Sequence, residues 1–373
     1  MTFFSYRRMH AVCQKEFKHI FRDPFTLMMA LLLPLLIVLI LGNSIEFNVQ
    51  SIDLAYVDFS QTQSSRKLVE TFGSSGYFRP YCVATPDQGI RDIVSERAKM
   101  MLVIPPTFEK EILAGRTGTV QIMIDGADNS SVSAIMNYLN TINTTAIYKI
   151  LDIPPAPKTP LSFKQRYLFN PELNTKWFAI PGLSAVIIAL VAIMLTALTV
   201  CREWEQGSME MLLSTPVSAA EIMIGKLLPY AFLSFIGFII VFLAARLIFG
   251  VPFVGNYLIL ITATALFILG YLALGLFISV TSREQQVAVQ YAAIIGLLPT
   301  ALLSGFIFPI EYMPRVYQWF SALFPARFYV EISRDQFLKG SGWTDLWIPF
   351  LALAVQAGVL LLGCIFKFKR SLE

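Results

Sequence analysis

Six stretches of the sequence are long and apolar enough to cross a lipid bilayer, and this feature constrains the fold more than any other. A helix needs about 20 mostly apolar residues to cross a hydrocarbon core of roughly 30 Å. The stretches are Phe25–Gly42, Phe178–Cys201, Leu227–Phe249, Tyr257–Val280, Val287–Phe308 and Leu346–Phe366. Of the 373 residues, 55% are hydrophobic and only 14% are charged, far fewer than in a soluble protein. The sequence therefore predicts an α-helical polytopic membrane protein with six transmembrane helices.

Basic residues predict the orientation of these helices. Lys and Arg are enriched in the cytoplasmic segments that flank membrane helices. Those next to the first and last stretches are Arg7, Arg8, Lys15, Lys18, Arg22, Lys367, Lys369 and Arg370. Six crossings place both ends of the chain on one side, so we expect both termini in the cytoplasm. Residues 202–226 are then cytoplasmic, whereas residues 43–177 and 309–345 face outward.

Residues 43–177 form a polar insertion between the first and second stretches. Strand-like patterns (IDLAYVDF, MMLVIP, VQIMID) alternate there with helix-like patterns (SSRKLVETF, PTFEKEILAG). Such alternation is typical of a small α/β or α+β domain. We therefore expect an inserted α/β (α+β) extracytoplasmic domain, followed by a stiff proline-rich linker at Asp152–Pro160.

Residues 309–345, between the fifth and sixth stretches, are aromatic but too polar to span a membrane. Aromatic side chains gather at the depth of the lipid headgroups. The segment therefore predicts short amphipathic helices at the outer interface, with Tyr317, Trp319 and Tyr329 at that depth. An ordinary loop packed on the outer domain is the alternative.

Several kinds of chemistry are missing from the sequence. The only histidines, His10 and His19, precede the first stretch, so residues 43–177 contain neither a Ser-His-Asp triad nor a histidine metal site. No G-x-x-x-x-G-K-[ST] motif is present, so the chain has no P-loop for ATP. The net charge of +4 gives no indication of nucleic-acid binding. These observations predict a chain that is not itself an enzyme and has no ATP-binding motif of its own.

Three other functions stay open as alternatives. An ion-coupled carrier usually has ionisable residues within its membrane helices, but the predicted spans are nearly free of them, with Arg246 as the clear exception. A membrane-anchored scaffold or adaptor-docking protein would use residues 43–177 as an interaction module. A membrane-anchored enzyme would need an acidic or serine-based site in the same residues.

The segment at residues 202–226, REWEQGSMEMLLSTPVSAAEIMIGK, is the most concentrated polar patch in the second half of the chain. A short helix is predicted over Met209–Ser214, and Ser218 with Glu221 forms an S-x-x-E capping box that starts the next helix. Apolar side chains on a short helix at the water side suit docking into the groove of a partner. A helix lying on the lipid surface is the alternative.

This segment resembles the cytoplasmic loop of the permease subunits of type-two ATP-binding-cassette (ABC) exporters. Four further segments resemble the bacterial multidrug and lipid-exporter kind of that family, which has a large extracytoplasmic domain. They are EFKHIFRDP, VIPPTFEKEILAGRTGTVQIMIDGAD, RYLFNPELNTKWFAIPGL and SGFIFPIEYMPRVYQWFSALFPARFYVEISRDQFLKG. The five segments follow the family's order along nearly the whole chain, which indicates the family but not the substrate.

The resemblance implies a homodimeric or heterodimeric permease in the bacterial inner (cytoplasmic) membrane. Such a permease exports a drug-like, lipid or other amphipathic substrate. Separate ABC ATPase subunits would bind ATP and Mg²⁺, so this chain would hold no cofactor. A periplasmic adaptor and an outer-membrane channel are compatible further partners.

The resemblance also implies roles for particular residues. Residues 1–24 would hold the cytoplasmic amphipathic connecting helix, residues 25–42 the first transmembrane helix, and residues 178–373 the other five with the coupling loop 202–226. The implied ATPase-coupling residues are Glu203, Glu205, Gly207, Glu210, Leu212 and Leu213. The implied connecting-helix residues are Glu16, Phe17, Arg22, Asp23 and Pro24. Gln290 and Thr300 are candidates for a substrate path at the dimer interface, although hydrogen bonds that pack helices explain them equally well.

Overall fold

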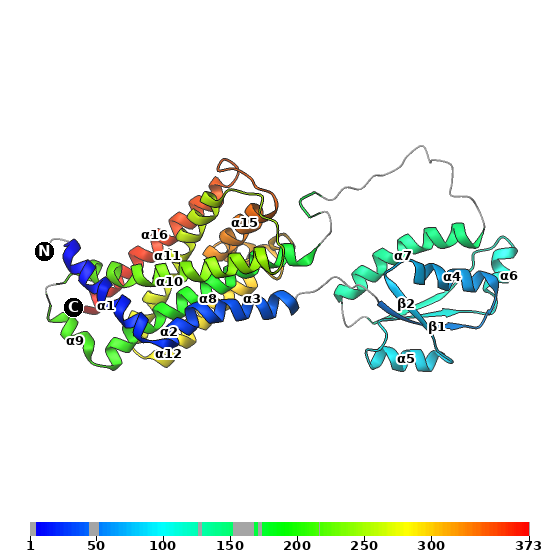
Figure 1. The fold of residues 1–373 in the computed structure, drawn as a ribbon, viewed down its shortest axis with the longest axis horizontal. Helices are drawn as coiled ribbons and strands as arrows, with labels where there is room; N and C mark the ends of the chain where they lie inside the picture. Colours follow the sequence, from blue (N-terminus) through cyan, green and yellow to red (C-terminus); the bar gives the residue numbers. More distant parts are fainter. Residues whose placement is uncertain are drawn as a thin grey trace. The chain divides into compact units, whose positions relative to one another are not determined.

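The computed structural model describes residues 5–44, 52–125, 129–151, 168–170, 174–215 and 217–372. The chain divides into two compact units (Figure 1). The helical unit comprises Met1–Ile45 and Tyr167–Glu373, and the sheet unit comprises Glu46–Arg166. The linker predicted at Asp152–Pro160 lies outside the described residues.

The described residues contain six helices that are long and apolar enough to span a membrane, and each predicted stretch corresponds to one of them. The stretches Leu227–Phe249, Val287–Phe308 and Leu346–Phe366 extend past the ends of their helices. The first span consists of α2 (Pro24–Leu27), the π-helix η1 (Met28–Leu32) and α3 (Leu33–Ser44). The second to fourth spans are α8 (Thr175–Glu205), α10 (Ala219–Leu247) and α11 (Tyr257–Ser282). The fifth consists of α12 (Gln285–Tyr291), the π-helix η2 (Ala292–Leu297) and α13 (Leu298–Leu303), and the sixth is α16 (Trp347–Leu372).

Helix α8 continues beyond the apolar stretch that predicted it. The stretch ends at Cys201, but the helix runs on to Glu205, and Gly207 then adopts a left-handed conformation with φ of 69°. Glycine adopts such a conformation at little cost and commonly ends helices. Glu203 and Glu205, two of the implied ATPase-coupling residues, therefore belong to the end of α8 rather than to the short helix that follows it.

Two further helices flank the spans at the end of the helical unit where α8 ends and α10 begins. Helix α1 (Tyr6–Arg22) packs along α10, and its buried residues Val12, Glu16 and Ile20 recur every four positions on one face. Helix α9 (Ser208–Leu213) lies between α8 and α10. The predicted capping box starts α10, because the Ser218 backbone N–H donates to Glu221 Oε2 at 2.7 Å and the Glu221 backbone N–H donates to Ser218 Oγ at 3.4 Å.

At the opposite end of the helical unit, residues 309–345 form η3 (Ile310–Tyr312), α14 (Arg315–Ser321) and α15 (Pro325–Leu338). Tyr317 and Trp319 are exposed on α14. The placement of Tyr329 at the interface is wrong, because its side chain is fully buried. Its ring stacks on Phe267 with 4.2 Å between centroids, and its hydroxyl shares a 3.0 Å hydrogen bond with that of Thr264.

The sheet unit is a four-stranded sheet with helices on both faces (Figure 1). Its strands are β1 (Ile52–Asp58), β2 (Phe78–Cys82), β3 (Met100–Ile104) and β4 (Gln121–Ile124), and the order in the sheet is β2-β1-β3-β4. Strand β1 pairs in parallel with β2 and β3, and β4 is antiparallel to β3. Helices α4 (Gln63–Ser74), α6 (Phe108–Leu113) and α7 (Asn129–Ile150) pack on one face and α5 (Pro86–Val94) on the other. Strands and helices thus form where the sequence patterns alternate.

Close packing of α11 against α8 depends on a small residue. A Cβ atom added at Gly275 would lie 2.6 Å from the Ile193 carbonyl oxygen, nearer than real Cβ atoms approach any atom. Small residues allow membrane helices to approach this closely.

We expect Gly275→Ala to destabilise the helical unit, because backbone atoms of α8 must move to admit the methyl group. Overpacking of this kind costs about 1–3 kcal/mol. Gly363→Ala is the matched control, since a Cβ atom there meets nothing within 4 Å. The apparent melting temperature of the purified chain in detergent should fall for Gly275→Ala only. Equal melting temperatures for the two variants would contradict the packing described here.

Candidate functional site

Four charged side chains meet where α1, the end of α8 and the start of α10 come together. Lys226 Nζ lies 2.8 Å from Glu16 Oε1 and 2.9 Å from Glu203 Oε2. Lys15 Nζ lies 2.6 Å from Glu203 Oε1. We call Lys15, Glu16, Glu203 and Lys226 the buried charge cluster, although Lys15 is half exposed. The cluster ties together three elements that are distant in sequence.

Lys226 is the centre of this cluster, because its side chain is only 2% exposed. An ammonium group removed from water is costly unless carboxylates pair with it. Two carboxylates and two ammonium groups balance the charge here. Tyr230, one turn further along α10, adds a hydrogen bond from its hydroxyl to Glu16 Oε2 at 3.4 Å.

A second ion pair fixes the corner between α1 and the first span. Asp23 caps the N-terminus of α2 and accepts hydrogen bonds from the Phe25 backbone N–H at 3.1 Å and the Thr26 hydroxyl at 2.8 Å. Arg202 of α8 donates to Asp23 Oδ2 at 2.8 Å. Partial burial acts to raise the pKa of Asp23, but the bonds from Arg202 and Thr26 outweigh it and lower that pKa to about 2. Asp23 is therefore ionised and tied to α8 at neutral pH.

The structure buries two of the implied coupling-loop and connecting-helix residues inside the chain. Glu16 and Glu203 are 4% and 8% exposed, so their carboxylates face Lys226 rather than an outside protein. Glu205 is exposed but accepts a 2.7 Å hydrogen bond from the Gln285 backbone N–H, which links α8 to the fifth span.

The other predicted residues have varied positions. On α1, Phe17 is half-buried with its ring 6.0 Å from that of Phe232, and Arg22 is exposed. Pro24 is the first residue of α2. Gly207 is exposed in the turn before α9. The side chains of Glu210, Leu212 and Leu213 lie outside the described residues.

The two candidates for a substrate path differ from each other. Gln290 of α12 is exposed. Thr300 of α13 is fully buried, where its hydroxyl bonds to that of Tyr271 and donates to the Gly296 carbonyl oxygen at 2.6 Å. In this structure, therefore, Thr300 makes hydrogen bonds that pack helices together.

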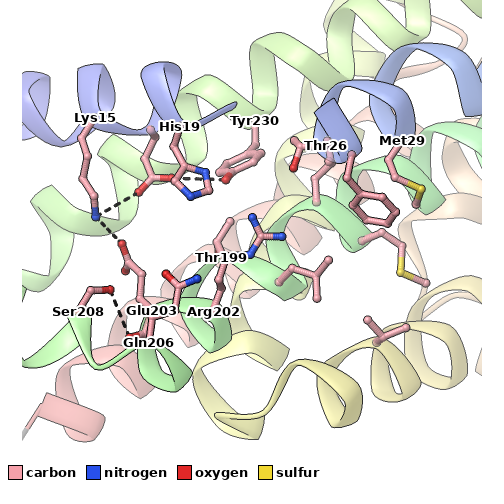
Figure 2. A pocket seen from close by; sticks show the side chains of 16 residues that line it. Lys15, His19, Thr26, Met29, Thr199, Arg202, Glu203, Gln206, Ser208 and Tyr230 are labelled. Carbon is pink, nitrogen blue, oxygen red and sulfur yellow. Dashed lines mark hydrogen bonds and ion pairs between the residues drawn. The ribbon is translucent and has the colours of Figure 1, made fainter. Parts of the chain in front are cut away.

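A cavity of about 450 Å³ opens beside the buried charge cluster, between α1, the first span, α8, the start of α9, α10 and α12. Figure 2 shows Lys15, His19, Arg202, Glu203 and Tyr230 around it, with Thr26 and Met29 further along. The apolar part of its lining consists of Phe25, Met29, Met194, Leu195, Leu198 and Val289. Among the described residues, no group of three or more His, Cys, Asp or Glu side chains is placed to hold a metal ion.

Sequence reasoning did not find the partner of Glu16, the cavity or the role of Lys226. One local signal existed, since Glu16 shares a helix face with Val12 and Ile20. A carboxylate among buried apolar residues requires a cation, but nothing local identifies which of the chain's cations supplies it.

Comparisons with known proteins agree with this architecture. The sequence profile of the ABC-2 family transporter proteins matches residues 24–366. The chain belongs to this family. The probable multidrug ABC transporter permease YbhS of Escherichia coli (strain K12) is 32% identical over 381 aligned residues, which cover 99% of this chain and 98% of YbhS.

Two other relatives in that strain cover most of the chain. The probable multidrug ABC transporter permease YbhR is 27% identical, over 95% of this chain and 96% of its own length. The inner membrane transport permease YhhJ is 27% identical, over 86% of this chain and 85% of its own length. The chain is therefore an ABC transporter permease with transmembrane helices, and its family implies ATPase partners and dimerisation.

We expect Lys226→Met to destabilise the permease, because it leaves Glu16 and Glu203 buried with only Lys15 nearby. Breaking a buried ion pair from one side costs about 3–5 kcal/mol. Lys18→Met is the matched control, since Lys18 is exposed on α1. The apparent melting temperature in detergent should fall for Lys226→Met and stay within a few degrees of wild type for Lys18→Met.

A second variant separates lost charge pairing from lost packing. Glu16→Gln combined with Lys226→Met removes one carboxylate together with the ammonium group, so it should recover part of the lost stability. If Lys226→Met and the Lys18→Met control have the same apparent melting temperature, the cluster does not hold the three elements together.

Proposed function

We propose that this chain is the membrane-spanning subunit of an ABC exporter in a bacterial inner membrane. Separate ATPase subunits that dock on the coupling loop, residues 202–226, would drive it to export a drug-like, lipid or other amphipathic compound. The observation that carries the proposal is the buried charge cluster, which joins both ends of this loop to α1. The descriptions of YbhS as a probable multidrug permease and of YhhJ as an inner membrane permease support a multidrug substrate and an inner-membrane location.

The geometry of the helical unit supports the proposed orientation. Helix α1, α9 and the C-terminus lie at the same end of this unit (Figure 1). At the other end, Gly42 of α3 packs on Phe249 after α10, and Gly182 of α8 packs on Phe306. The last residue of α3, Ser44, and the first residue of α8, Thr175, belong to that other end. With the basic residues of α1 in the cytoplasm, the sheet unit is the proposed extracytoplasmic domain and the surface available to a periplasmic adaptor.

Helix α9 is the proposed contact with the ATPase. Met209 is 1% exposed and anchors α9 to the helical unit, whereas Met211 is 71% exposed. A flexible, polarizable methionine adapts well to the groove of a partner. Displacement of α9 would pass to α8 and α10, and through the buried charge cluster to α1, as a rigid-body movement.

The faces of the first and fifth spans support a dimer. In the most apolar part of the first and of the fifth span, only 28% of the residues are buried within the chain. The corresponding share for α8 is 78%. A second copy or a related permease chain packed there would enclose a path lined by the first, second and fifth spans. The sixth span, also 28% buried in its most apolar part, would then face lipid.

The ion-coupled carrier remains the alternative, and the buried charge cluster is the observation that favours it. Titratable groups inside membrane proteins are typical of proton relays. In this chain, however, the charges are paired and lie at the ends of the spans, where α1 covers them. A carrier would transport without an ATPase, so the same experiment decides between the two functions.

We expect Met211→Asp to prevent ATPase docking while leaving the permease folded, since the changed side chain is exposed. A central contact of a protein interface contributes about 2 kcal/mol or more, so capture of the ATPase should fall more than tenfold. The ATPase is the subunit that co-purifies with the wild-type chain, identified by mass spectrometry. Its stimulated hydrolysis should fall to the same extent.

Leu113→Asp is the matched control, because Leu113 is 80% exposed on the sheet unit, the proposed extracytoplasmic domain. It should bind and stimulate the ATPase like wild type. Normal capture and stimulation by Met211→Asp would show that α9 is not the docking element. Transport by the purified chain without any ATPase would establish the carrier instead.

A further inference from the structure

The cavity beside the buried charge cluster has two chemically different parts. One part is apolar, with Met29 of the first span and Leu195 and Leu198 of α8 in its wall. Its mouth continues into an open groove along the polar side of α1, which shares Lys15, His19 and Arg202 with the cavity. The groove adds Lys18 and Arg22. An apolar interior therefore opens onto a surface rich in cations.

The charge balance of these residues leaves a positive excess at the mouth. Arg202 is paired with Asp23, and the buried charge cluster is balanced within itself. Lys18 and Arg22 make no ion pair with any residue that the structure describes. They are four positions apart on α1, so they lie on the same side of the helix. Two cations on the groove are thus available to a ligand.

We propose that this cavity and groove bind an amphiphile with an anionic headgroup and a hydrocarbon tail. Lys18 and Arg22 hold the headgroup, since ammonium and guanidinium groups form strong hydrogen bonds to phosphate, sulfate and carboxylate oxygens. The tail lies against Met29, Leu195 and Leu198, and the volume of about 450 Å³ is typical of small-molecule sites. Met29 and Met194 give the wall side chains that adapt to tails of different shape.

Two sources supply this chemistry, an anionic phospholipid of the inner leaflet and an exported anionic compound. As an entry site for the exported compound, the inference rests on the proposed function. As a binding site, it does not, because binding requires neither an ATPase nor ATP. The test is therefore made on the full-length permease alone.

The probe is dodecyl phosphate with a photoreactive diazirine at the end of its tail. The full chain is placed in nanodiscs of neutral phosphatidylcholine, illuminated with the probe and analysed by peptide mass spectrometry. We expect labels on peptides that contain Met29 or residues 195–198, and stronger competition from unlabelled dodecyl phosphate than from dodecyltrimethylammonium. Labels only on the lipid-facing sixth span, or equal competition by the two compounds, would overturn the proposal.

Two pairs of variants test the two parts of the site separately. Lys18→Gln should lower labelling up to about fivefold, the effect of losing one exposed charge contact of about 1 kcal/mol. Arg7→Gln removes an exposed charge from α1 outside the groove and should change nothing. Leu198→Trp fills the apolar part and should abolish labelling, whereas Val359→Trp, at an exposed position of α16, should not. Unchanged labelling in both Lys18→Gln and Leu198→Trp would refute the site.

The source of the ligand is decided in nanodiscs that contain increasing fractions of phosphatidylglycerol. Loss of labelling as this lipid increases identifies an anionic phospholipid as the occupant, and unchanged labelling identifies an exported anionic compound. Met211→Asp should retain full labelling even though it loses the ATPase. Failure of ATPase docking and failure of ligand binding are thus measured independently.

Discussion

A lysine side chain buried among helices is stable only when carboxylates pair with it, and this requirement fixes the arrangement of one end of the permease. Lys226 at the start of α10 is 2% exposed and pairs with Glu16 of α1 and Glu203 of α8. Removing any one partner leaves an uncompensated buried charge, at a cost of about 3–5 kcal/mol. The three elements therefore have one favourable arrangement, although they are separated by about 190 and 20 positions in sequence.

The last turn of α8 connects this cluster to other spans. Successive residues of a helix point about 100° apart, so a single turn reaches several neighbours. Arg202 bonds to Asp23 at the start of the first span, and Glu203 bonds to Lys226 of the third. Glu205 bonds to Gln285 of the fifth. Helix α9 follows directly after this turn, so a force applied to α9 reaches three spans through polar contacts as well as through packing.

The sequence predicts those features that depend on local patterns. Apolar stretches of sufficient length located the six spans, Ser218 and Glu221 predicted the start of α10, and alternating patterns located the strands and helices of the sheet unit. Helix ends were less predictable, because α8 continues through polar residues until Gly207 ends it.

Features that depend on distant parts of the chain could not be predicted in this way. Glu16 and Glu203 are charged residues of the kind expected on a polar docking surface. Only the tertiary structure shows that they are buried and paired with Lys226. Tyr329 has the sequence character of an interfacial aromatic residue, yet α15 packs it against α11. The cavity is formed by elements brought together from across the chain, so no single segment indicates it.

We propose that α1, the end of α8 and the start of α10 move as one body when an ATPase displaces α9. This movement is tested most directly by electron paramagnetic resonance on the ATPase-bound permease, in a chain whose four cysteines have been replaced. Spin labels at Gln14 of α1 and Gln206 after α8 report the distance across the buried charge cluster. We predict the same distance without ATP and after trapping with ATP and vanadate, and a broadened distribution when Lys226→Met is added. A shift of that distance on trapping in the otherwise unchanged chain would contradict the account.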